Sequence, residues 1–187
     1  LGLQLVTSPT VNGQVTSANL VPRSSVQDTY AQILADLTTA KPLLNDEIGV
    51  FASKYAAAAI LSRVYLQMGD YAKARDEANE VIENSGASLT TTYVGAFNNA
   101  DPSSEDIFVL PVTAQDGTND MWLFWSTSDY GARDGDVEVN QEHLDLYDPA
   151  DQRLALFWDV DDIYYSGKYR YQYRFLSQVR LAEMILT

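Results

Sequence analysis

The feature that most constrains the fold is a run of four alanines, Ala56 to Ala59, within an apolar stretch. Larger apolar residues follow the alanines at the helical period of 3.6 residues: Ile60, Leu61, Val64, Tyr65 and Met68. This spacing predicts a helix over residues 53–68. Because the distance between two packed helices depends on the side chains at their contact, the alanines predict a close approach by a second helix.

A second helix is predicted to begin almost directly after the first. Gly69 suits the left-handed residue that ends a helix, and Asp70 is a suitable N-cap for a helix over residues 71–83. The inward positions of this helix are Ala74, Ala78, Val81 and Ile82. A helix pair with so tight a corner is typical of tetratricopeptide-type repeats. Such a pair supplies packing surfaces and no reactive group, so the pattern favours a binding scaffold over a catalyst.

One further helix is predicted on the N-terminal side of this pair. Ser24, with Gln27 three residues later, is a candidate capping box, and Pro42 lies where a break or kink is expected. Between them runs an apolar stripe at helical spacing: Val26, Tyr30, Ile33, Leu34 and Leu37. The three helices form an expected helical scaffold over residues 23–86.

The sequence changes character after residue 87. Residues 107–112 form a short apolar run that is either a strand or an extended packing segment. Residues 116–140 read as a loop with several Trp and Tyr side chains, and Asn140 is a candidate cap for a short helix ending at Tyr147. A loop region this long inside one domain is usually functional or disordered. Its aromatic content argues against disorder.

The last part of the chain returns to regular structure. Residues 163–175 alternate aromatic and polar side chains around Ser166-Gly167, which predicts a β-hairpin. A helical pattern then predicts a returning helix over residues 176–187. We therefore expect a single, mainly α domain over residues 1–187, with a tetratricopeptide-like helical scaffold, a loop-rich ligand-binding lobe over residues 87–175, and one short hairpin.

Composition excludes several classes of function. The chain has 12 Lys and Arg against 26 Asp and Glu, a net charge of −14, so its surface repels nucleic-acid phosphates and anionic lipid headgroups. It contains no cysteine, which excludes disulfides and zinc–thiolate sites within it. The sequence contains no run of 18 apolar residues, so no segment that spans a bilayer is predicted. His143 is the one histidine and is expected to be structural or exposed, so no metal, cofactor or catalytic residue is predicted.

Short motifs follow one another in a specific order along nearly the whole chain. They are residues 21–26 before the first helix, 33–37 within it, 63–66 in the alanine-rich helix, 69–71 at the corner, 104–108, 146–153, and 180–183. In this order and spacing the chain resembles the SusD/RagB family of outer-membrane nutrient-binding lipoproteins.

The resemblance implies fold, location and function together. Members of this family have a tetratricopeptide-type scaffold with a loop-rich lobe, and they are secreted and lipidated at an N-terminal Cys. They sit over a TonB-dependent transporter at the bacterial outer membrane and capture glycans or other nutrients, as in starch and polysaccharide utilisation. The resemblance therefore implies a surface-facing, non-enzymatic protein that binds an oligosaccharide or small nutrient for delivery to such a transporter.

The chain is also expected to be part of a longer protein. Its first residues, Leu1 to Val6, begin abruptly in an apolar run, and the last predicted helix has no terminating signal. Family members are much longer than this chain. The lipidated Cys of the family is absent here, so a lipid anchor would lie outside this sequence.

The best ligand candidates lie in the aromatic loop. The rings of Trp122, Trp125 and Tyr130 could stack on the apolar C–H faces of a sugar, and nearby polar side chains could bind its hydroxyls: Asn119, Asp120, Asp129 and Arg133. The alternative is that one or both Trp rings pin the loop to the core, because Trp is usually largely buried.

Two further groups are assigned structural roles. Tyr169, Tyr171 and Tyr173 would share one face of the predicted hairpin, where cross-strand packing explains them better than a stacking platform does. Arg63 and Arg180 fall in apolar helices and are expected to pair with acids such as Asp36 or Glu183.

Two alternatives to nutrient binding stay open at this level. The helix pair supports equally well a scaffold whose ligand is another protein. A glycoside hydrolase would need two carboxylates that converge across a cleft. Acids close in sequence, such as Asp134 with Asp136 and Asp159 with Asp161, are expected on the surface of so acidic a chain. The segment from Asp134 to Asp136 also lacks the ligand series of a helix-loop-helix calcium site.

Overall fold

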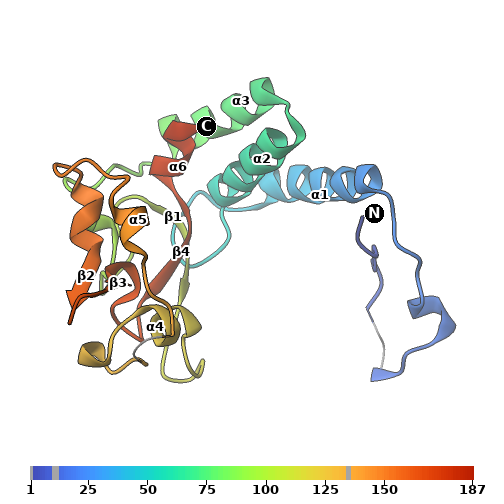
Figure 1. Cartoon of the computed structure of the whole chain (residues 1–187). Coiled ribbons are helices and arrows are strands. Elements are labelled where there is room, and N and C mark those ends of the chain that lie inside the picture. The colour runs from blue at the N-terminus through green and yellow to red at the C-terminus, as the bar shows by residue number, and fades with distance from the viewer. Residues whose placement is uncertain (1, 10–12, 134–135) are drawn as a thin grey trace.

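The computed structural model describes residues 2–9, 13–133 and 136–187 of the chain. Leu1 and Asp134, both discussed above, lie outside the described residues. Three long helices form one layer of the molecule (Figure 1): α1 Val26–Ala40, α2 Lys54–Met68 and α3 Tyr71–Asn84. A short 3-10 turn, η3 Lys41–Leu43, follows α1 directly. The predicted helical scaffold is present, and the fold is mainly α.

The ends of these helices follow from local chemistry. Gly69 closes α2 with a φ of 79°, and the Asp70 carboxylate accepts a hydrogen bond from the Lys73 backbone N–H to cap α3. Both predictions at this corner are confirmed. The capping box of α1 lies one residue later than predicted, because the Asp28 carboxylate accepts from both the N–H and the hydroxyl of Ser25. A carboxylate is a stronger acceptor here than the amide of Gln27 would be.

The core lies where α2 and α3 meet. Ala58, Ala59, Ala74 and Ala78 are fully buried in this contact. The buried Ser62 hydroxyl donates to the Ala74 carbonyl at 2.9 Å, so it has a hydrogen-bond partner inside the interface. The core cluster extends from these helices to two strands and the last helix: Tyr55, Ala58, Ala59, Ala78, Val81, Ile107, Val179 and Met184.

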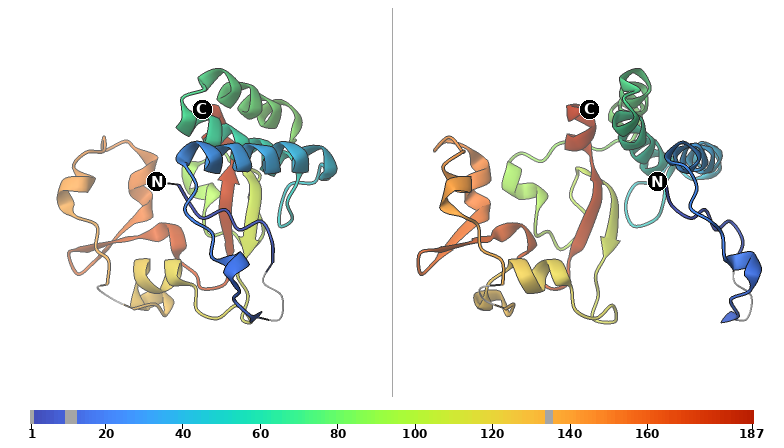
Figure 2. Two further views of the ribbon diagram at one scale, coloured as in Figure 1. Left: turned by 90° about the vertical axis from the view of Figure 1, so that its right-hand side faces the viewer. Right: turned by 45° about the vertical axis from the view of Figure 1, so that its right-hand side comes forward.

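Two strands distant in sequence form the sheet that joins the helices to the rest of the chain. β1 Asp106–Pro111 pairs antiparallel with β4 Phe175–Arg180, with register shifts around Phe108. Figure 2 shows this ribbon between the helical layer and the lobe that β2, β3, α4 and α5 build. The apolar run at residues 107–112, for which sequence left two alternatives, is therefore mainly a strand.

The returning helix is shorter than predicted. Residues 176–180 belong to β4, and only Leu181–Leu186 form a helix, α6, which packs on α3. The prediction was wrong for the first residues because their backbone groups bond to β1. Such pairing between distant segments leaves no mark in the local apolar pattern.

The hairpin also differs from its prediction. It joins β2 Phe157–Val160 to β3 Ile163–Ser166, not two strands within residues 163–175. Asp161 and Asp162 make the turn, with φ of 54° and 63°, a conformation that aspartate tolerates better than most residues. Gly167 serves another purpose, since a Cβ there would lie 3.0 Å from Trp158 Nε1. The glycine permits close packing and does not make the turn.

The remaining elements are short. The lobe contains α4 Asp120–Trp125 and α5 Gln141–Leu144, of which α5 lies within the predicted helix 140–147. The 3-10 turns are η2 Ser17–Asn19, η4 Tyr93–Ala96, η5 Ser128–Tyr130, η6 Gln152–Leu156 and η7 Gly167–Tyr169. None of the helices in the described part of the chain is both long and apolar enough to cross a membrane.

Two arginines form ion pairs between segments that are distant in sequence. Arg63 on α2 pairs with Glu183 on α6, as predicted, and also donates to the Gln178 carbonyl on β4 at 2.6 Å. Arg180 pairs instead with the buried Asp106 of β1, with an N–O distance of 3.3 Å. The predicted partners of Arg180 are replaced because strand pairing sets Asp106 directly opposite it.

The alanine contact can be tested by overfilling it. We expect Ala78→Leu to lower the free energy of unfolding by about 1–3 kcal/mol, because the extra carbons have no space between α2 and α3. Urea denaturation measures this change. Ala72→Leu, at an exposed position of the same helix, is the control and should stay within about 0.5 kcal/mol of the parent protein. Equal stability of the two variants would contradict the close packing.

The Asp70 cap predicts a specific pH dependence. Hydrogen bonds from the Lys73 side chain and backbone lower the pKa of Asp70 from its usual 3.8. The ionised carboxylate therefore stabilises the fold above that value, and the stabilisation disappears as the pH falls through the lowered pKa. We expect parent protein and Asp70→Asn, which keeps a capping group, to differ in unfolding free energy at pH 7, and this difference to shrink only as the pH falls below 3.8 and through the lowered pKa. A difference independent of pH would contradict this account.

Candidate functional site

The lobe contains a groove lined by aromatic rings, which we call the aromatic groove. Its volume is about 550 Å³. Five rings line it, contributed by α4, α5, the turn after α5, β2 and η7: Trp125, His143, Tyr147, Phe157 and Tyr169. Polar side chains lie among them: Glu138, Asn140, Ser166 and Lys168. The groove therefore combines flat apolar surfaces with hydrogen-bonding groups.

One wall of the aromatic groove is a packed set of three rings. His143 and Phe157 both contact Tyr147, with ring centroids 5.3 and 5.5 Å away, and lie 5.8 Å from each other. The Tyr147 hydroxyl and His143 Nε2 share a hydrogen bond of 3.1 Å. Arg153 lies over Tyr147, 4.6 Å from the ring centroid. These contacts hold the wall in one orientation.

Trp125 is the predicted site residue that lines this groove. It ends α4, and its side chain keeps 37% of its surface exposed. The orientation of α4 depends on Asn119, which caps the helix at Met121 N and donates from Nδ2 to the Gln172 carbonyl at 3.1 Å. Asn119 is itself buried. It thus acts by placing α4 and does not line the groove.

Trp122 has the packing role that sequence analysis held as the alternative. Only 7% of its surface is exposed. Its Nε1 donates to the Tyr130 carbonyl at 3.1 Å, and its ring lies against Gly131, where a Cβ would stand 3.7 Å from Trp122 Cζ2. The two predicted tryptophans therefore face different surroundings, although three positions separate them in one short helix.

Tyr130 belongs to a second aromatic cluster. Its ring lies 4.7 Å from that of Trp158 and 5.6 Å from that of Tyr171. The Arg170 guanidinium lies over Trp158, 3.5 Å from the ring centroid, and 5.5 Å from Tyr130. Tyr130 is not among the residues that line the aromatic groove.

The other predicted polar residues are exposed and lie outside the aromatic groove. Asp120 begins α4, and Asp129 lies in η5. Arg133 pairs with Asp136 at 2.9 Å and lies 5.6 Å from the Phe124 ring centroid. Of the predicted set, only Trp125 contributes to the groove.

Sequence reasoning missed most of the groove. His143 and Tyr147 are four residues apart at the short helix predicted over 140–147, a spacing that brings side chains together on one face. That spacing was a usable signal. Phe157 and Tyr169 had no comparable signal, because β2 was not predicted and Tyr169 was assigned to a strand that does not form.

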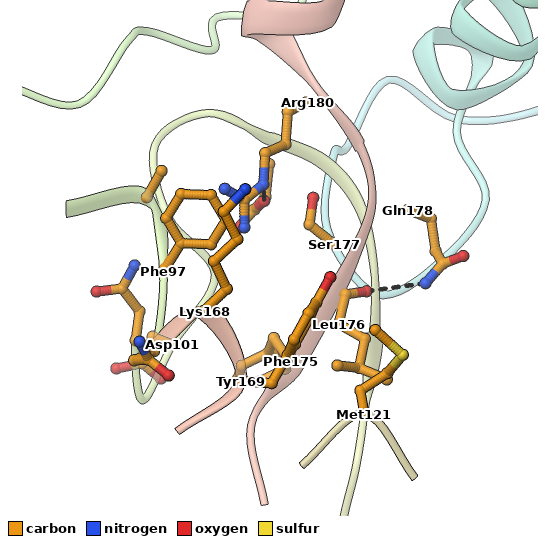
Figure 3. A pocket seen from close by; sticks show the side chains of 14 residues that line it. Phe97, Asp101, Met121, Lys168, Tyr169, Phe175, Leu176, Ser177, Gln178 and Arg180 are labelled. Atoms are coloured by element: carbon orange, nitrogen blue, oxygen red, sulfur yellow. Dashed lines mark hydrogen bonds and ion pairs between the residues drawn. The ribbon is translucent and has the colours of Figure 1, made fainter. Parts of the chain in front are cut away.

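A second pocket adjoins the aromatic groove, and we call it the Phe97 pocket (Figure 3). Its volume is about 320 Å³, and it shares Met121, Lys168 and Tyr169 with the groove. Figure 3 shows the Phe97 ring with the Lys168 and Arg180 side chains beside it. Their cationic groups lie 5.2 and 4.3 Å from the ring centroid. Lys168 and Tyr169 thus border both hollows.

The described residues offer no grouping of three or more His, Asp or Glu side chains that could hold a metal ion. The lining of the aromatic groove is suited to stacking and hydrogen bonding.

The contrast between the two tryptophans is testable. We expect Trp122→Ala to cost about 3–5 kcal/mol of unfolding free energy, because it empties a buried site and frees the Tyr130 carbonyl. Trp125→Ala should cost much less, since that ring is partly exposed. Thermal and urea denaturation of both variants measure the difference. Equal losses would show that Trp125 is also a structural anchor.

The chain is similar to one described protein family and to several solved structures. Residues 4–66 match a SusD-like family described as starch-binding and associating with the outer membrane. No protein with a curated description matches the chain significantly. Among solved structures, a SusD superfamily protein from Bacteroides thetaiotaomicron VPI-5482 is 25% identical, with a TM-score of 0.81 over 100% of this chain and 46% of that one.

Two other structures share the fold at lower identity. A SusD-like carbohydrate binding protein from Bacteroides vulgatus ATCC 8482 is 21% identical, with a TM-score of 0.75 over 98% of this chain and 42% of its own. A laminarin binding SusD-like protein is 19% identical, with a TM-score of 0.76 over 98% of this chain and 53% of its own. This chain thus spans about half the length of these proteins. The family match and the shared fold confirm the resemblance to the SusD/RagB family.

Proposed function

We propose that this chain binds an oligosaccharide in the aromatic groove, without cleaving it. In this proposal the chain is the recognition part of a nutrient-binding lipoprotein at the bacterial outer membrane, which passes its cargo to a TonB-dependent transporter. The observation that carries the proposal is the aromatic groove itself, with Trp125 and Tyr169 among polar side chains.

The chemistry of the groove suits a sugar. A pyranose ring presents apolar C–H faces, which stack on aromatic rings, and hydroxyls at its edge, which need donors and acceptors. Ligand sites are commonly hollows of roughly 300–1,000 Å³ lined by aromatic residues and a few polar groups. The aromatic groove lies within this range at about 550 Å³. Asn140, Ser166 and Lys168 supply polar groups next to the rings.

The carboxylates that line the groove are too few for hydrolysis, which supports binding without bond cleavage. A glycoside hydrolase needs two carboxylates on either side of the scissile bond. Among the described lining residues, Glu138 alone carries a carboxylate. The aspartates that the sequence analysis weighed, Asp159 and Asp161, are exposed and do not line the groove.

The expected affinity is modest. An aromatic contact contributes about 1 kcal/mol, and ordering the ligand and the side chains opposes it. A protein that must release its cargo to a transporter benefits from such weak binding. The outer-membrane setting rests on the description of the matching family, and the cargo class on the carbohydrate-binding relatives.

A protein partner is the second candidate function, and one observation favours it. Leu66, Met68 and Tyr71 are exposed apolar side chains around the corner between α2 and α3. Exposed apolar residues gathered at one place commonly mark an interface. A helical scaffold that bound only a protein would use this corner and not the aromatic groove.

Removing groove rings tests the proposed function. We expect Trp125→Ala and Tyr147→Ala each to weaken binding of oligosaccharides about fivefold, which corresponds to one stacked ring at about 1 kcal/mol. A glycan array identifies a bound oligosaccharide, and isothermal titration calorimetry then measures its Kd for each variant. Laminarin and starch oligosaccharides are the first neutral probes.

Tyr71→Ala is the matched control, because Tyr71 is an exposed aromatic residue on the helical scaffold. It should bind sugars as the parent protein does. If no carbohydrate binds while Tyr71→Ala loses a protein partner, the scaffold function replaces this one. Release of reducing sugar that Glu138→Gln abolishes would instead identify a hydrolase.

A further inference from the structure

The Lys and Arg side chains of this acidic chain differ in whether a carboxylate pairs with them. Most Lys and Arg side chains form an ion pair with a carboxylate: Lys41, Lys54, Arg63, Lys73, Arg75, Arg133, Arg153 and Arg180. Four form none with any carboxylate in the described part of the chain: Arg23, which precedes α1, and the three cations Lys168, Arg170 and Arg174. These three lie within seven residues of one another, in a segment without Asp or Glu between Asp162 and Glu183.

One residue holds this segment in place. Asn98, with a φ of 60°, donates from Nδ2 to the Gly167 carbonyl at 2.7 Å and accepts at Oδ1 from the Arg170 backbone N–H at 2.8 Å. Its carbonyl accepts from Arg174 Nε at 3.4 Å. Asn98 also lines the Phe97 pocket. The cationic segment is therefore fixed beside this pocket.

Lys168 is the cation best placed to meet a ligand. It lines both the aromatic groove and the Phe97 pocket, and its side chain is half-buried. Its ammonium lies 5.2 Å from the Phe97 ring centroid and 5.7 Å from that of Tyr93. Ring faces attract a cation but do not neutralise its charge. The ammonium therefore keeps its hydrogen-bonding capacity for an anion.

The acids around the Phe97 pocket leave this charge uncompensated. Asp106 is engaged by Arg180 and accepts two hydrogen bonds from Ser103. Asp101 lines the pocket with an exposed side chain, and Glu138 lines the aromatic groove. Neither of these two forms an ion pair with Lys168 among the described contacts.

We propose that the oligosaccharide bound in the aromatic groove is acidic, and that Lys168 recognises its anionic group. The anionic group is a carboxylate, as in a uronic acid, or a sulfate ester. Sugar rings would stack along the aromatic groove while the charged substituent reaches toward the Phe97 pocket. This inference rests on the proposed function and narrows its substrate class.

Three ligands test the inference on the full chain: an oligogalacturonide, a sulfated galactan oligosaccharide, and a neutral laminarin oligosaccharide. We expect one of the acidic ligands to bind at least tenfold more tightly than the neutral one in calorimetry. This preference should shrink as salt is raised, because added ions screen a partly exposed charge. Comparison of the two acidic ligands distinguishes carboxylate from sulfate.

Variants test whether Lys168 causes the preference for acidic over neutral oligosaccharides. Lys168→Gln should lower the ratio of acidic to neutral affinity about tenfold, and Lys168→Arg should restore most of it. Asp101→Asn should raise the affinity for the acidic ligand, because it removes a repelling charge from the pocket. Lys73→Ala, a paired cation on the helical scaffold, is the control and should change neither affinity.

The outcomes separate this inference from the proposed function. Equal affinity for acidic and neutral oligosaccharides, or a ratio that Lys168→Gln leaves unchanged, would overturn the acidic preference while carbohydrate binding stands. Binding of no oligosaccharide at all would overturn both.

Discussion

The pairing of β1 with β4 is the interaction on which the rest of the structure depends. These strands stand at the two ends of a long irregular segment, and their pairing brings the ends together. Ile107 and Val179 then carry both strands into the core formed by α2, α3 and α6. Arg63 reinforces the same junction from α2. A lobe built mostly of short elements thereby gains a fixed base, which offsets the entropy of closing so long a loop.

Within that lobe, the aromatic groove is assembled from segments that are not neighbours in sequence. Trp125 comes from α4, Tyr147 from the turn after α5, and Phe157 from β2. Buried anchors such as Trp122 and Asn119 orient the short elements, so the exposed rings keep their positions. Recognition by stacking needs this rigidity, because rings that must first be ordered lose part of their binding energy.

The cations of the molecule fall into two groups with different surroundings. The chain carries a net charge of −14, and most of its cations are neutralised locally by carboxylates. Lys168, Arg170 and Arg174 lie instead against aromatic rings, in a segment held by Asn98. A local cationic site within a negative surface would favour an anionic group on a ligand only when its other parts also fit. This arrangement gives selectivity without general attraction to polyanions.

The sequence by itself determined the helix pair, because its signals are local. The alanines, Gly69 and the Asp70 cap act within a few residues, and all three predictions at this corner held. The resemblance to the SusD/RagB family was also readable from ordered motifs. Only the tertiary structure decided the site: it buried Trp122, exposed Trp125, moved the hairpin to Asp161-Asp162, and turned residues 176–180 into a strand. The physical reason is that strand pairing and side-chain exposure depend on distant partners, which local periodicity does not encode.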